Sequence, residues 1–132
     1  DRRYRLVQWH THLDAGLPAV RTVPARLQQA LSTLLAASAD AVTAGGELTL
    51  SSRGRGSVVE CEIIDTRGEA AARAVVGRLD DADDRQEDDT VRAVVLARTS
   101  VADLGARLTL APLAAGLAIT VALEVAEEGA SS

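Results

Sequence analysis

The chain has 132 residues, of which 47% are hydrophobic and 25% are charged, and its formal net charge is −5. This composition is typical of one folded globular domain and excludes a disordered chain. Because the net charge is negative, we expect no nucleic-acid binding, which usually needs a basic surface. No apolar run reaches the roughly 20 residues that span a bilayer, so we expect no direct membrane contact.

Single features of the sequence exclude some kinds of site and indicate where the protein is located. The lone cysteine, Cys61, excludes an internal disulfide and a cysteine-based zinc cage. The chain shows no secretory signal pattern, so we expect a cytoplasmic location. It begins with Asp1, and we therefore expect a fragment of a longer protein. We treat residues 1–132 as a single domain with a polar tail from about residue 127.

The first half of the chain is predicted to form a strand and a long helix. Loose alternation predicts the strand over 6–13, and a connection over 14–23 contains glycine and proline. The helix begins near Pro24, which suits a first helical turn, and ends at Gly45-Gly46. Its apolar face carries Leu27, Ala30, Leu31, Leu34, Leu35, Ser38 and Val42.

The second half is predicted to contain a hairpin, two helices and a closing pair of strands. β-Branched residues favour the strands, and a strongly acidic run favours a solvated loop. The segments are strands over 47–53 and 58–64 joined by 53–57, a helix over 69–79, the acidic loop over 80–89, a helix over 90–104, and strands over 107–111 and 118–125 joined by 112–116. This pattern predicts an α+β fold, a two-layer sandwich with a mixed sheet and helices packed on one face.

Several local sequences occur in the order and spacing of a known family. They are Leu27–Leu31 followed by Leu34-Leu35 and Ala39–Ala41, then Gly45–Leu50, Ile63–Thr66 and Gly105–Leu110. From about Val7 to Val125, the chain resembles the catalytic and ATP-binding domain of bacterial sensor histidine kinases. The resemblance implies a Bergerat-type fold, a histidine-kinase-like ATPase domain, and a place in two-component signal transduction or a phosphorelay.

The residues that hold magnesium in that family differ here. The resemblance places its two motif asparagines at Thr33 and Ala37, and the second of these asparagines holds the ion of Mg-ATP. Magnesium requires oxygen ligands in near-ideal geometry, and the Ala37 methyl group supplies none. We therefore expect no metal site.

The adenine motif is only partly retained. The resemblance assigns adenine recognition to Asp65, with Gly68 as the second cofactor-binding residue if a nucleotide binds. Arg67 and Glu69 replace the motif glycines, and we expect each to cost about 1 kcal/mol where φ must be positive. Both side chains also add bulk, and Glu69 adds negative charge near the phosphates.

The later glycine motif, at a helix start, falls on Thr90–Val94, with Val91 and Ala93 in place of its glycines. Backbone N–H groups at a helix N-terminus form a natural phosphate site. We expect the branched side chain of Val91 to stand where a phosphate would approach. The lid between the two motifs, 69–89, is acidic and is expected to repel a nucleotide.

Other residues each admit a structural explanation beside a functional one. Asp65 could bind adenine or cap the turn that follows it. Arg92 could bind phosphate in compensation or be a solvated helix residue. His10 and His12 share one strand face and could bind a metal or accept a phosphate, although a structural role is favoured. Cys61 is expected to face the helices as a small buried hydrophobe.

The combined expectation is a degenerate ATP-binding domain, a pseudokinase, with no catalytic residue and no cofactor. It would be a signalling scaffold for a response regulator or phosphotransfer protein, or for a helical dimerisation domain of its parent chain. Two alternatives stay open: a working or weakly working histidine kinase domain that binds ATP with magnesium through Asp65, and an anti-sigma-factor-like regulator of the same superfamily.

Overall fold

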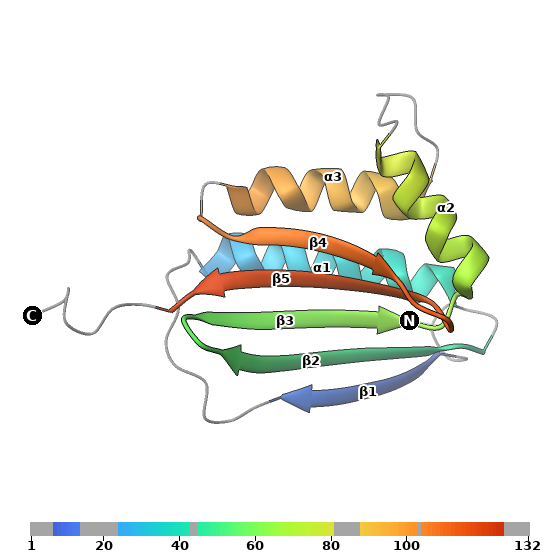
Figure 1. Ribbon diagram of the computed structural model, residues 1–132, viewed down its shortest axis with the longest axis horizontal. Coiled ribbons are helices and arrows are strands. Elements are labelled where there is room, and N and C mark those ends of the chain that lie inside the picture. Colours follow the sequence, from blue (N-terminus) through green and yellow to red (C-terminus); the bar gives the residue numbers. More distant parts are fainter. Residues whose placement is uncertain (1–6, 14–23, 43–44, 81–87, 103, 126–132) are drawn as a thin grey trace, which may run out of the picture.

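The computed structural model describes residues 7–13, 24–42, 45–80, 88–102 and 104–125, which form one sheet with helices on one face (Figure 1). The elements are β1 (Gln8–Leu13), α1 (Pro24–Ala41), β2 (Glu47–Arg55), β3 (Val58–Asp65), α2 (Glu69–Asp80), α3 (Asp89–Ala102), β4 (Arg107–Pro112) and β5 (Leu117–Glu124). The predicted α+β sandwich is confirmed.

The sheet is mixed, as predicted. Its five strands lie in the order β1-β2-β3-β5-β4. β1 pairs with β2 in parallel, and the remaining neighbours are antiparallel. β3 is the central strand, between β2 and β5, and Asp65 at its end is fully buried.

The turn between β2 and β3 is tighter than the predicted connection over 53–57. β2 continues to Arg55, which pairs with Val58, and Gly54 pairs with Val59. Gly56 has φ of 62° at the first of the two loop positions, which matches a type II′ hairpin turn. The prediction was wrong because it treated Gly54 as a break, whereas the strand pairing includes this glycine.

The core lies between the sheet and the pair α1 and α3, which pack side by side, while α2 lies at one end (Figure 1). The predicted apolar face of α1 is confirmed, since Ala30 and Leu34 are buried. Cys61 packs partly buried against the same core, and this burial raises the pKa of its thiol. The predicted orientation of Cys61 toward the helices is therefore confirmed.

Ser38 is the exception on the buried face of α1. It is 0% exposed, and its Oγ has no hydrogen-bond partner among the described residues. A buried polar atom without a partner costs about 1–3 kcal/mol. We expect Ser38→Ala to raise the free energy of unfolding by about 1 kcal/mol in urea denaturation. A loss of stability would show that the hydroxyl is satisfied in solution.

The predicted acidic loop over 80–89 is shorter than expected at both ends. Asp80 ends α2 and Asp89 begins α3. Residues 81–87, like the predicted connection over 14–23 and the tail from 127, lie outside the described residues. None of the helices that the structure describes is long and apolar enough to cross a membrane.

Candidate functional site

The candidate site is built around the turn that follows β3. Thr66 locks this turn to β2, because its N–H donates to the Glu47 carbonyl at 3.1 Å and its hydroxyl accepts from the Glu47 N–H at 2.8 Å. Gly68, with φ of 101°, donates its N–H to the carbonyl of Ala115 at 2.9 Å. The turn is therefore held from two sides, by the start of β2 and by Ala115.

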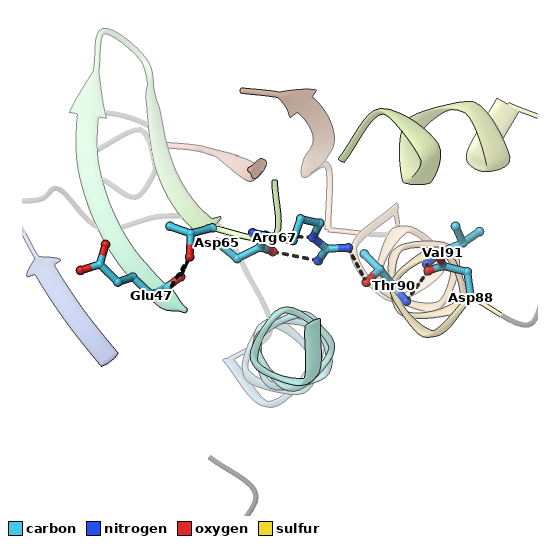
Figure 2. A network of polar contacts seen from close by, with 7 residues as sticks. Glu47, Asp65, Arg67, Asp88, Thr90 and Val91 are labelled. Carbon is cyan, nitrogen blue, oxygen red and sulfur yellow. Dashed lines mark hydrogen bonds and ion pairs between the residues drawn. The ribbon is translucent and has the colours of Figure 1, made fainter. Parts of the chain in front are cut away.

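Asp65 and Arg67 form a buried ion pair within this turn. Arg67 Nε donates to Asp65 Oδ1 and Nη2 donates to Oδ2, both at 2.8 Å, so the guanidinium engages both carboxylate oxygens (Figure 2). The Arg67 backbone N–H also donates to Oδ1, at 3.2 Å. The Asp65 side chain is 0% exposed and the Arg67 side chain only 6%. The capping role considered for Asp65 is thus present, together with a bidentate contact that the sequence analysis did not predict.

The same guanidinium links the turn to α3. Arg67 Nη1 donates to the hydroxyl of Thr90 at 3.0 Å, and Thr90 is itself buried. One side chain therefore joins the end of β3 to the first turn of α3, 23 residues further along the chain.

The N-terminus of α3 is capped from within the chain. Asp88 Oδ1 accepts from the backbone N–H groups of Thr90 and Val91, at 2.9 and 3.0 Å (Figure 2). The second carboxylate oxygen of Asp88 accepts from Arg78 at 2.8 Å. Free N–H groups at a helix start attract anions, and here a side-chain carboxylate already occupies them.

A small open pocket lies beside these groups. Its volume is about 200 Å³, below the roughly 300–1,000 Å³ of typical small-molecule sites. Arg67 is part of its wall, and Asp65 is buried behind Arg67, outside the lining. The lining residues are Ala37, Asp40, Ala41, Arg67, Asp88, Asp89 and Thr90.

The structure brings only some of the predicted positions together. Ala37 and Arg67 line one pocket, with Asp65 directly behind. The Thr33 hydroxyl donates to the Gln29 carbonyl at 2.9 Å within α1 and does not line this pocket. Glu69 is exposed in the first turn of α2 and does not line the pocket either.

Two expectations about the glycine replacements were wrong. The Val91 side chain is 1% exposed and belongs to the core, as does Ala93 at 5%, so Val91 does not block the helix start. Arg67 and Glu69 adopt ordinary backbone angles, since no described residue other than glycine has positive φ. Only Gly68 requires the left-handed region in this turn, so the expected backbone strain is absent at both positions.

Asp88 is the site residue that the sequence analysis missed. It was assigned to the acidic loop because its neighbours are charged. An aspartate shortly before an apolar helical pattern is a common N-cap signal, and this rule would have identified it.

The other candidates do not line this pocket. Arg92 is exposed and forms an ion pair with Asp89. On exposed β1, His10 Nε2 lies 3.4 Å from Oε1 of Glu47, the first residue of β2. The described residues contain no group of three or more potential metal ligands. A larger open hollow of about 400 Å³ lies on the uncovered sheet face, lined by Val58, Glu60, Gly105, Arg107, Thr109, Thr120, Ala122 and Glu124.

Sequence comparisons find no match, whereas structural comparisons find solved proteins of the same fold. No protein-family model matches the chain, and no curated protein matches it. A nucleotide-free catalytic domain of the histidine kinase ThkA is similar with a TM-score of 0.73 and 12% identity, over 90% of this chain and 78% of that one. The mycobacterial sensor histidine kinase MprB is similar with a TM-score of 0.67 and 17% identity, over 93% and 85%.

Longer histidine kinases contain the same fold. Full-length ShkA, solved in complex with AMPPNP, matches with a TM-score of 0.73 and 17% identity, over 95% of this chain and 28% of that one. ThkA in complex with the response regulator TrrA matches with a TM-score of 0.69 and 13% identity, over 91% and 34%. The chain therefore has the fold of the catalytic domains of histidine kinases, the histidine-kinase-like ATPase fold.

Proposed function

We propose that this chain is a two-component signalling domain that has the histidine-kinase catalytic fold but does not bind Mg-ATP. One observation carries the proposal: the Asp65 carboxylate, which the resemblance assigns to adenine, is engaged at both oxygens by Arg67 of the same chain. Charge-assisted bidentate pairs are among the stronger hydrogen bonds in proteins. A nucleotide base would have to displace this pair from a buried position.

The rest of the site supports the same conclusion. The methyl group of Ala37 offers magnesium no ligand atom, and the first N–H groups of α3 already bind Asp88. Asp40, Asp88 and Asp89 line the remaining space, where the carboxylates of Asp88 and Asp89 already bind Arg78 and Arg92. A separate feature of the site therefore disfavours binding of each part of Mg-ATP: the base, the metal ion and the phosphates.

The proposed role is that of a cytoplasmic signalling scaffold. Its partner would be a response regulator or phosphotransfer protein, or a helical dimerisation domain of the parent chain. The complex of ThkA with the response regulator TrrA supports this class of partner, because it joins a domain of the same fold to a response regulator.

Calorimetric titration of the domain with ATP and with ADP, each with and without Mg²⁺, tests the proposal. We expect no heat of binding up to millimolar nucleotide, because the base position is filled. ShkA titrated with AMPPNP, with which it has been crystallised, is the positive control. Micromolar affinity that strengthens with Mg²⁺ would contradict the proposal and favour a working histidine kinase domain that binds ATP through Asp65.

A further inference from the structure

The Arg67 side chain fills the space in front of the buried Asp65 carboxylate. Its planar guanidinium presents two parallel N–H donors to the two oxygens of Asp65, both at 2.8 Å, and a third donor to Thr90. All three guanidinium donors come from this one flexible side chain, whereas the acceptor residues, Asp65 and Thr90, belong to β3 and α3. The arrangement is a planar donor group bound in a site whose acceptors come from the surrounding fold.

The walls of this site are held without the Arg67 side chain. The backbone and hydroxyl of Thr66 are bonded to Glu47, and Gly68 is bonded to Ala115. The first turn of α3 is fixed by the Asp88 cap. Because Arg67 also forms part of the wall of the open pocket, removing its side chain would connect that pocket with the buried carboxylate.

We propose that Arg67 is a tethered ligand of Asp65 that fills, and so closes, a binding site for a planar group with N–H donors on one edge. The ligand class is a guanidinium or amidine cation, or the amino edge of a nucleobase. This inference rests on the proposed function, in which Asp65 lies at the base position. It adds that one residue keeps the site closed and that the site reopens when this residue is shortened.

The test is chemical rescue of Arg67→Ala, followed by thermal unfolding. Methylguanidinium at about ten times its Kd is expected to raise the Tm of Arg67→Ala by about 5 °C, because it binds only the folded state. It should not raise the Tm of the unmodified domain, where the site is full. Arg92→Ala is the matched control, since it removes an exposed arginine that pairs with Asp89 at the same pocket and leaves Asp65 covered.

A double variant separates recognition from simple cavity filling. Asp65→Asn together with Arg67→Ala keeps the space but replaces one carboxylate oxygen with an amide donor, so rescue should be lost. Adenine is the second probe. Stabilisation by methylguanidinium alone supports a site for cations, and stabilisation by adenine as well extends the site to neutral bases. If neither probe stabilises Arg67→Ala more than Arg92→Ala, the proposal is overturned.

A measurement on the unmodified domain keeps the proposal testable if Arg67→Ala does not fold. In NMR spectra at neutral pH, the Nε–H and Nη–H signals of Arg67 should exchange slowly with water and remain distinct, because all three guanidinium nitrogens are hydrogen-bonded. A freely rotating guanidinium would overturn the proposal. If the rescue of Arg67→Ala fails and the unmodified domain does not bind Mg-ATP, the proposed function stands and only this inference is lost. If the unmodified domain binds Mg-ATP, the proposed function is refuted whatever the rescue shows.

Discussion

Arg67→Ala is expected to lower the free energy of unfolding by about 3–5 kcal/mol, the usual cost of removing one partner from a buried ion pair. Asp65 is 0% exposed in the unmodified domain, and in the variant its carboxylate would lose both guanidinium contacts and keep the backbone N–H donor. The Thr90 hydroxyl would lose its link to the turn as well. Urea denaturation monitored by circular dichroism measures the change.

The control is an arginine in an exposed ion pair. Arg53 Nε lies 3.0 Å from Glu60 Oε1, but the Arg53 side chain is 53% exposed. Exposed pairs contribute at most about 1 kcal/mol, so Arg53→Ala should have a small effect. If Arg67→Ala costs no more than Arg53→Ala, the Asp65–Arg67 pair does not have the buried character described here.

Removing both charges together should lower the free energy of unfolding less than removing the arginine alone. In Asp65→Asn combined with Arg67→Met, no buried charge is left without a partner, and the asparagine oxygen can still accept from the residue 67 N–H. We expect this double variant to be more stable than Arg67→Ala. The comparison separates the cost of an orphaned carboxylate from the net contribution of the pair.

The fold could be predicted because its signals are local and repeated. Apolar residues at helical spacing identified α1, and β-branched residues identified β3. The predicted end of β2 was wrong because a single glycine resembled a turn but lay within the strand ladder. Strand pairing, a long-range property, decided that boundary. The predicted end of the first helix at Gly45-Gly46 was wrong as well, since α1 ends at Ala41.

The site could be predicted only in part because its contacts depend on tertiary packing. Asp65 and Arg67 were recognised as unusual, but the side-chain direction of Arg67 depends on where α3 packs against the end of β3. The expectation that Val91 would stand at a phosphate position came from the family resemblance, whereas its side chain lies in the core on the buried face of α3. Local sequence thus located the site, while packing determined what fills it.

The loop between β4 and β5 supports this site through Gly116. A Cβ atom built on Gly116 would overlap the carbonyl oxygen of Asp65 and would also lie 3.0 Å from the Cα of Thr66. The obstacle is backbone on both counts, so no side-chain rotation can relieve it. The backbone of Gly116 does not need positive φ, and the requirement for glycine here is therefore one of space alone.

Gly116→Ala is accordingly expected to lower the free energy of unfolding by about 3 kcal/mol, the upper range of overpacking costs, by forcing the loop away from the Asp65–Gly68 turn. Gly77→Ala is the matched control, because a Cβ at exposed Gly77 in α2 meets nothing within 4 Å. There the same substitution should raise stability by about 0.5–1 kcal/mol through helix propensity. Urea denaturation of the two variants should therefore give shifts of opposite sign. A neutral Gly116→Ala would mean that the loop is not held against Asp65, and the Gly68–Ala115 hydrogen bond would then lose its role in fixing the turn.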